Sequence, residues 1–239
     1  MKEDNPFSPV YDSRYFCDRN EEIKRLQTNF YNGLNTVIHS LRRLGKTALI
    51  RHLFHQLEAE NAADTIYVDL FATGKMQDLI SLLAEKVLQK YHRKNLLQGI
   101  QQVLKGLNPS VSFAPDGTPF FNLQLNEAQH ELSLRQIFDY LENRKKRVFI
   151  AFDEFQEIGT YPEKAEALLR THIQELRNTG FIFSGSTGHI IHEMFLGPKR
   201  PFYQQAEVLV LGKINREAYR SFIIDTFNKH KKKMEPEAV

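Results

Sequence analysis

The chain has 239 residues, of which 41% are hydrophobic and 26% are charged, so it can bury a sizeable core. It has no apolar run of about 18 residues and no basic-then-apolar leader, so we expect neither a membrane span nor a secretory signal, and we predict a cytoplasmic protein. The single cysteine, Cys17, excludes an internal disulfide, and the net charge of +3, from 32 basic and 29 acidic residues, does not indicate DNA binding.

The N-terminal region is predicted to form an arm followed by a helix. Residues 1–15 contain two prolines and little periodicity, which favours an extended arm. Asp18 with Glu21 three residues later predicts a capped helix, and apolar residues from Ile23 to Phe30 recur on one of its faces. The next apolar run, residues 34–39, predicts the first strand.

A phosphate-binding loop follows this strand. The run from Ser40 to Thr47 matches the pattern G-x-x-x-x-G-K-[ST] except at Ser40, which stands where the first glycine usually lies. Such a loop offers unpaired N–H groups at the start of a helix, here residues 48–57, to phosphate oxygens. Lys46 can reach the β and γ phosphates, and Thr47 can ligate Mg2+ through its hydroxyl. Ser40 either tightens the turn or crowds the loop if a positive φ is required. The predicted nucleotide-binding residues here are Ser40, Leu41, Arg42, Arg43, Leu44, Gly45, Lys46, Thr47 and Ala48.

The middle of the chain alternates strands and helices, with one interruption. Residues 65–70 predict a second buried strand, and apolar residues over 79–91 predict the helix after it. Residues 105–125 carry three prolines and the turn signal Asp116-Gly117 between two short strand-like runs. They predict a β-hairpin or extended insertion over one face. A helix over residues 126–144 leads to the next strand.

An apolar strand that ends in two carboxylates provides a second nucleotide signal. Residues 148–152 form a continuous apolar run before Asp153 and Glu154, as expected of a parallel strand that faces a ligand crevice. We expect Asp153 to hold Mg2+ through water and Glu154 to orient or deprotonate the attacking water. Asp69 is a rival for the metal, but Leu70 follows it and offers no base. If Asp69 does not bind the metal, it either caps the end of its strand or holds Glu154 away from the water.

The remaining elements complete a parallel sheet. Apolar residues over 168–176 predict a helix, and residues 181–186 and 208–211 predict the fourth and fifth strands. A final helix is predicted over residues 216–231. Five buried runs that alternate with helices indicate an α/β fold, a parallel sheet covered on both faces.

Two further patterns bear on the ligand. The run Asn228-Lys229-His230-Lys231 lacks the final aspartate of a guanine-reading Asn-Lys-x-Asp sequence, so ATP is favoured over GTP. The basic runs at 144–147 and 229–233 are interpreted as cationic helix ends, with DNA contact as the alternative.

Five motifs lie in order along nearly the whole chain. They are Tyr15-Phe16-Cys17-Asp18-Arg19-Asn20-Glu21-Glu22, Arg42-Arg43-Leu44-Gly45-Lys46-Thr47, Phe155-Gln156-Glu157-Ile158, Phe183-Ser184-Gly185-Ser186 and Arg200-Pro201-Phe202-Tyr203. The first resembles the Phe-x-Gly-Arg-x-x-Glu box of AAA+ and STAND ATPases, and the others are similar to the archaeal-type ATPase family. The chain departs from the family at Ser40 and at Cys17-Asp18, where Val-Gly or a similar pair usually precedes Arg19.

The resemblance implies a P-loop NTPase fold of the AAA+ type. The implied sheet has strand order 5-1-4-3-2 and carries a helical lid, usually followed by a winged-helix domain. It divides this chain into an ATPase core over residues 1–212 and the start of an incomplete lid over residues 213–239. Ser186 is implied as the polar sensor near the γ phosphate, with Ser184 as the alternative.

Three further residues have roles implied by the resemblance. Phe16 and Arg19 are expected near the adenine, although they equally suit a role in holding the N-terminal helix against the sheet. Arg200 is expected to reach the ATP of a neighbouring subunit and to stabilise transition-state charge, which implies self-association. A surface arginine is the alternative for Arg200.

Two functions remain open at this point. The first is a slow Mg-dependent ATPase that works as a conformational switch, in which ATP closes the lid and hydrolysis with Glu154 as base releases it. The second is a nucleotide-binding scaffold for a protein or DNA partner, with little or no hydrolysis. Ser40 and the incomplete lid favour the second modestly, because a partial lid sequesters ATP poorly from water.

Overall fold

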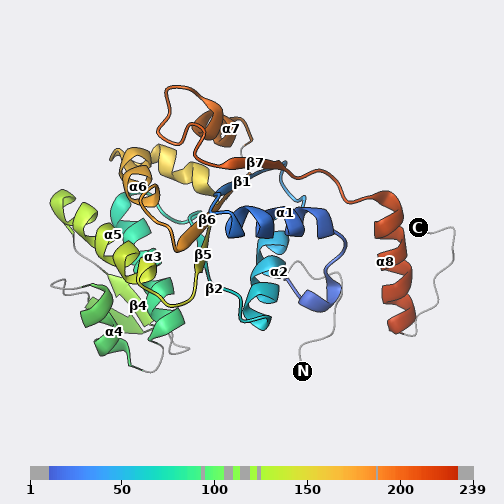
Figure 1. Cartoon of the computed structure of the whole chain (residues 1–239), viewed down its shortest axis with the longest axis horizontal. Helices are drawn as coiled ribbons and strands as arrows, with labels where there is room; N and C mark the ends of the chain where they lie inside the picture. The colour runs from blue at the N-terminus through green and yellow to red at the C-terminus, as the bar shows by residue number, and fades with distance from the viewer. Residues whose placement is uncertain are drawn as a thin grey trace.

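The fold is built on a five-stranded parallel sheet, seen in a computed structural model that describes residues 11–92, 95–104, 110–113, 119–122, 125–186 and 188–230. The strands are β1 (Thr36–His39), β2 (Asp64–Asp69), β5 (Val148–Asp153), β6 (Thr179–Gly185) and β7 (Glu207–Val210). Their order is β2-β5-β6-β1-β7, and every neighbouring pair is parallel (Figure 1). Counted along the chain this is 2-3-4-1-5, which confirms the predicted order 5-1-4-3-2 read from the other edge.

The sheet is buried on both faces, as the continuous apolar runs predict. Every residue of β5 and β6 is buried, so these strands form the centre of the sheet. Successive residues of a strand point to opposite faces, so the strands contribute to two cores: Val37 of β1 and Phe152 of β5 pack on one side, whereas Ile38 and Phe149 pack on the other. The result is a three-layer α/β arrangement.

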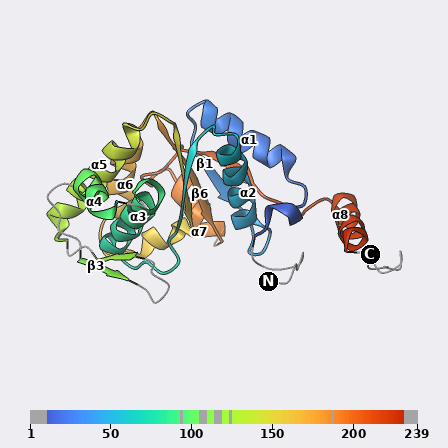
Figure 2. The same ribbon diagram turned by 90° about the horizontal axis from the view of Figure 1, so that it is seen from below.

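A different set of helices covers each face of the sheet (Figure 2). One core joins the sheet to α1 (Asn20–Tyr31) and α2 (Lys46–Ala59). The other joins it to α3 (Met76–Tyr91), α5 (Glu127–Glu142), α6 (Ala165–Ile173) and α7 (Gly188–Leu196). Of the helices in the described ranges, none combines the length and the apolar character needed to cross a membrane.

The start of the chain corrects one sequence prediction. The helix α1 begins at Asn20 with Arg19 as its N-cap residue, and no side chain caps it, so the predicted Asp18 cap is wrong. Asp18 and Arg19 both have left-handed backbone conformations, with φ of 59° and 73°, whereas a capping side chain normally requires an extended N-cap residue. Residues 1–10 of the predicted arm lie outside the described residues, and Ser13–Tyr15 forms the short 3-10 helix η1.

The predicted insertion contains paired strands. β3 (Ser110–Phe113) and β4 (Pro119–Asn122) pair antiparallel, whereas the predicted turn at Asp116-Gly117 lies outside the described residues. Three helical elements after residue 92 have no counterpart among the sequence predictions, namely α4 (Leu96–Val103), α7 (Gly188–Leu196) and the 3-10 helix η2 (Phe155–Thr160). The element η2 follows directly after Glu154 and so shapes the end of β5.

The last described helix, α8 (Arg216–Lys229), lies apart from the sheet in both views (Figures 1 and 2). All of α8 is described, and Thr226 is its one buried residue. Segment 11–17 contacts it, because the Tyr15 hydroxyl lies 2.9 Å from Nε2 of His230, just past the helix end. The N-terminal segment therefore connects α8 to the rest of the molecule.

Candidate functional site

The phosphate loop joins the end of β1 to the start of α2. The helix begins at Lys46, two residues earlier than the periodicity predicts, with Gly45 as the N-cap residue at φ 87°. A left-handed conformation of this kind favours glycine. Arg43 is also left-handed, with φ 65°. The loop therefore ends where the first free N–H groups of α2 are presented, which is the expected arrangement for binding phosphate.

Ser40 fits the loop without strain. Its φ is not positive, so a glycine is not required at this position in this loop. The residue is buried, with 3% of its surface exposed. Its hydroxyl donates to the Leu41 carbonyl at 2.9 Å and accepts from Nζ of Lys46 at 3.3 Å. Of the two alternatives for this departure from the pattern, the structure favours a tightened turn.

We expect Ser40→Gly to lower the free energy of unfolding by about 1–2 kcal/mol, because it removes a buried hydrogen bond and adds backbone freedom to the unfolded chain. Ser40→Ala removes the hydroxyl alone and should account for about half of that loss. Urea unfolding of both variants measures the two contributions. An unchanged or raised stability in Ser40→Gly would show that the serine does strain the loop.

Lys46 lies in a buried position beside the carboxylates of β5. The residue is 6% exposed, and Nζ also lies 3.5 Å from the Leu41 carbonyl. Burial lowers the pKa of the Lys46 ammonium, whereas the carboxylates of Glu154 and Asp153 act in the opposite direction. The ammonium is thus a cation with few solvent contacts, aimed at the loop where phosphates are expected.

Asp153 is held by four donors from four parts of the structure. Oδ2 accepts from the hydroxyls of Thr47, at 2.7 Å, and Tyr67, at 2.5 Å. Oδ1 accepts from the Ser184 hydroxyl and from the Glu154 backbone N–H, the latter at 3.1 Å. The pair of Thr47 hydroxyl and Asp153 carboxylate provides the oxygen donors that Mg2+ prefers, so the predicted metal residues lie together.

Glu154 adopts a left-handed conformation with φ 52°, which turns its side chain toward β6. Its Oε2 accepts from the Ser186 hydroxyl at 2.7 Å, from the Ser186 N–H at 3.3 Å and from Nε2 of Gln156 at 2.6 Å. The two candidate sensor residues therefore contact different carboxylates: Ser186 contacts Glu154, and Ser184 contacts Asp153. Gln156, which the sequence analysis does not identify as a site residue, is 5% exposed and orients the predicted base.

Asp69 lies at the end of β2 in register with Asp153. Its side chain is exposed, and Oδ1 accepts from the backbone N–H of Phe71 at 3.0 Å. This contact supports the alternative in which Asp69 caps the strand end, because the carboxylate is used by its own turn.

Phe16 and Arg19 connect the N-terminal segment to the loop and to the approach to α8. The ring of Phe16 stacks on His52 of α2, with centroids 3.9 Å apart. Nη2 of Arg19 donates to the carbonyls of Leu44, at 3.2 Å, and Gly212, at 2.6 Å. These contacts fit the alternative in which both residues hold the N-terminal region in place, and they join the phosphate loop to the segment that leads to α8.

Arg200 lies between α7 and β7 and pairs with Glu166 of α6. Glu166 is 8% exposed, and burial raises its pKa, whereas Arg200 acts in the opposite direction. A cation bonded to a buried carboxylate of its own chain has a structural use, which favours the structural alternative for Arg200.

Arg200→Ala should reduce the free energy of unfolding by about 1–3 kcal/mol, because the Glu166 carboxylate then stays buried without a cation. The matched control is Arg25→Ala, which removes the exposed pair with Glu207 and should cost less than about 1 kcal/mol. Urea unfolding compares the two. Equal losses would show that the Arg200 pair is no more than a surface contact.

The raised pKa of Glu166 also has a pH consequence. The folded state binds this proton more tightly than the unfolded state, so stability from this group declines as pH rises from its ordinary pKa of 4.5 to the higher folded value. Glu166→Gln should remove that decline, which unfolding measured across this pH range detects. A decline of the same size in the variant would assign it to another group.

The basic run at 144–147 has structural partners. The Arg144 guanidinium lies 4.3 Å from the ring centroid of Tyr91, Lys146 pairs with Asp64 at 3.5 Å, and Arg147 donates to the Tyr31 carbonyl at 3.2 Å. The predicted cationic helix end is wrong, because α5 ends at Glu142 with no basic residue in its last turn, and the run lies in the connection from α5 to β5. Most of the second run, at 231–233, lies outside the described residues.

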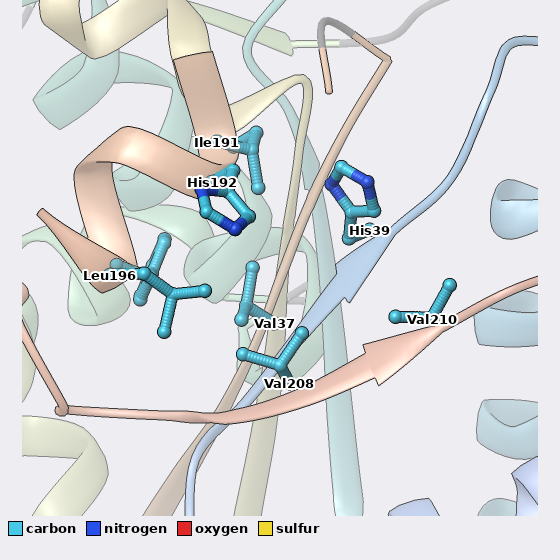
Figure 3. Close-up of a pocket in the computed structure, with 8 residues that line it drawn as sticks. Val37, His39, Ile191, His192, Leu196, Val208 and Val210 are labelled. Atoms are coloured by element: carbon cyan, nitrogen blue, oxygen red, sulfur yellow. The ribbon is translucent and has the colours of Figure 1, made fainter. Parts of the chain in front are cut away.

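A separate pocket of about 280 Å3 lies between α7 and the strands β1 and β7 (Figure 3). The pocket is lined by three valines, Val37, Val208 and Val210, and by His39 and His192. The ring centroids of the two histidines are 6.2 Å apart. The lining of the pocket does not include Lys46, Asp153 or Glu154, so it is distinct from the site described above.

The strand order, the loop at the start of α2 and the two carboxylates at the end of β5 define a P-loop NTPase of the AAA+ type. A family model described as "ATPase domain predominantly from Archaea" matches residues 16–237. The chain belongs to this family. A search of curated proteins finds no match.

Solved structures share the fold. The Walker-type ATPase paby2304 of Pyrococcus abyssi is similar with a TM-score of 0.68 and 19% identity, over 98% of this chain and 65% of that one. The ORC2 protein of Aeropyrum pernix, solved in ADPNP-ADP complexes, has a TM-score of 0.63 and 16% identity, over 95% and 56%. The ORC1 protein of the same organism, in complex with DNA, has a TM-score of 0.60 and 16% identity, over 90% and 50%. This chain thus spans between half and two-thirds of their lengths.

Proposed function

We propose that this chain binds Mg-ATP between the phosphate loop and the end of β5, and hydrolyses it slowly to ADP and phosphate. The observation that carries the proposal is the convergence of Lys46, Thr47, Asp153 and Glu154 from α2 and β5, with Thr47 and Asp153 joined at 2.7 Å. Membership of an ATPase family supports the same chemistry.

Each residue has a defined part in this proposal. Lys46 and the first N–H groups of α2 bind the phosphates, and Thr47 and Asp153 hold Mg2+. Bound Mg2+ neutralises charge on the phosphate oxygens. Glu154 orients a water and takes its proton as the water oxygen attacks the γ phosphorus and the bond to ADP breaks. Ser186 keeps the Glu154 carboxylate at this edge of the sheet.

The remaining predicted site residues have supporting parts. Phe16 and Arg19 hold the N-terminal segment against α2 and the phosphate loop, and Arg200 is available to a neighbouring subunit's ATP only if its pair with Glu166 opens. We propose a cytoplasmic location and a core over residues 1–212, with α8 as the first lid helix.

A switching role is supported by the hydrogen bonds that the Arg19 guanidinium donates to two carbonyls in different segments. Arg19 bonds the phosphate loop at Leu44 and the segment before α8 at Gly212, so a movement of the loop on nucleotide binding is transmitted toward α8. We propose that ATP closes α8 toward the sheet and that hydrolysis releases it.

The second candidate function is a nucleotide-binding scaffold for a protein or DNA partner, with little hydrolysis. It is favoured by the position of α8, in which a single residue, Thr226, is buried, so that α8 does not shield the site from water. The relative solved with DNA makes DNA a candidate partner, although the charge of this chain does not indicate it.

Phosphate release under saturating Mg-ATP separates the two functions. We expect slow release, on the order of one turnover per minute or slower, in keeping with nucleotide switches that lack an activating partner. ATP binding without any release above the spontaneous rate would replace the ATPase with the scaffold.

A further inference from the structure

Tyr67 contacts the Asp153 carboxylate, the proposed Mg2+ ligand, from the neighbouring strand β2. Its hydroxyl donates to Oδ2 of Asp153 at 2.5 Å. We propose that Tyr67 is a positioning residue for Asp153, holding the carboxylate in the orientation that receives Mg2+; this rests on the proposed Mg-ATP site.

The sheet register explains how Tyr67 reaches this carboxylate. Tyr67 of β2 pairs with Ala151 of β5, two residues before the Asp69–Asp153 pair, so Tyr67 and Asp153 point to the same face. The small side chain of Ala151 leaves room for the phenol to extend along the strand toward Asp153. The tyrosine is thus placed by backbone pairing rather than by a flexible loop.

A residue of α2 holds the Tyr67 ring in place. The Arg51 guanidinium lies 4.5 Å from the Tyr67 ring centroid, and Arg51 is one helical turn beyond Thr47 on the same face. The helix that carries Thr47, whose hydroxyl is proposed to bind Mg2+, therefore also holds the tyrosine.

The distribution of donors on Asp153 shows why Tyr67 matters when metal binds. Ser184 and the Glu154 N–H hold Oδ1, whereas Thr47 and Tyr67 share Oδ2. Once Thr47 turns its hydroxyl oxygen to Mg2+, Tyr67 is the remaining donor to Oδ2 among the described residues. Without Tyr67 the carboxylate is held through Oδ1 alone, so the position of Oδ2 is less well fixed and ordering it costs metal affinity.

The test compares ADP affinity in Mg2+ with ADP affinity in EDTA, measured by calorimetry on the full chain. We expect Tyr67→Phe to bind ADP in EDTA like the wild type, within about twofold, and to lose about tenfold of the affinity gained from Mg2+. Mn2+ binding to the ADP complex, followed by electron paramagnetic resonance, should weaken by a similar factor. Circular dichroism checks that the variant is folded.

Tyr140→Phe is the matched control. Its hydroxyl lies 2.8 Å from Nε2 of His92, and α5 covers the face of the sheet opposite α2. This variant should keep the full Mg2+ gain. An unchanged gain in Tyr67→Phe would overturn the positioning role while leaving nucleotide binding in place, and so would an equal loss in Mg2+ and in EDTA. A wild type that binds no ADP in either condition would instead overturn the proposed function and this inference with it.

Discussion

Glu154→Gln is expected to lower phosphate release at saturating Mg-ATP by at least about 100-fold, because glutamine keeps the size of the side chain but cannot take a proton from water. ATP affinity should stay within about threefold, since the phosphate contacts come from Lys46 and the start of α2. The amide oxygen still accepts from Ser186 and keeps the side chain at the end of β6. Rate and affinity therefore separate in this variant.

The matched control for this variant is Glu157→Gln. Glu157 lies in the same 3-10 turn and accepts from the same Gln156 amide, at 3.2 Å, so its removal changes the local charge equally. Phosphate release by the control should match the wild type. A Glu154→Gln enzyme that retains full release would show that another group activates the water, and equal losses in both variants would assign the effect to local charge.

Lys46→Ala has the second large expected effect, a loss of roughly 10–100-fold in ATP affinity, because a charged hydrogen bond to phosphate is removed from a buried position. This loss is expected whether the chain is an ATPase or a scaffold. Calorimetric titration with Mg-ATP measures it, with the exposed Lys24 changed to alanine as a control that should bind like the wild type. Equal affinity in Lys46→Ala and wild type would place the nucleotide elsewhere.

Replacing Lys46 lowers ATP affinity, but it should not lower the stability of the fold. Burial lowers the pKa of Lys46, so the folded state releases this proton more readily and stability from this group rises with pH up to its ordinary pKa of 10.5. Lys46→Met should therefore be as stable as the wild type or more stable at neutral pH, and lack this rise. A marked destabilisation would mean that the ammonium contributes net stability through Ser40.

Much of the architecture could be predicted because it depends on local patterns. The strands β5 and β6 are continuous apolar runs, and such runs alternating with helices leave few arrangements other than a doubly covered parallel sheet. The loop before Lys46 is recognisable because a glycine, a lysine and a threonine stand at fixed spacing between a strand and a helix. The strand order is implied by family resemblance, because periodicity alone does not order strands.

The contacts that complete the site could not be predicted from local pattern. Tyr67 reaches Asp153 through strand register, and its position two residues before Asp69 was the one available signal. Gln156 reaches Glu154 because the chain turns through a left-handed residue there. The predicted Asp18 cap is wrong for a similar reason. Arg19 donates hydrogen bonds to carbonyls that are distant in the sequence, and these contacts fix the backbone conformation before α1.

Calorimetric titration of the purified chain with Mg-ATP, with Mg-GTP in parallel, tests nucleotide binding at the Lys46 loop most directly. We expect ATP to bind with a micromolar Kd and GTP to bind more weakly, because no guanine-reading sequence is present in the chain. Absence of binding by either nucleotide would contradict a functional phosphate loop, and equal binding of both would contradict selection of ATP.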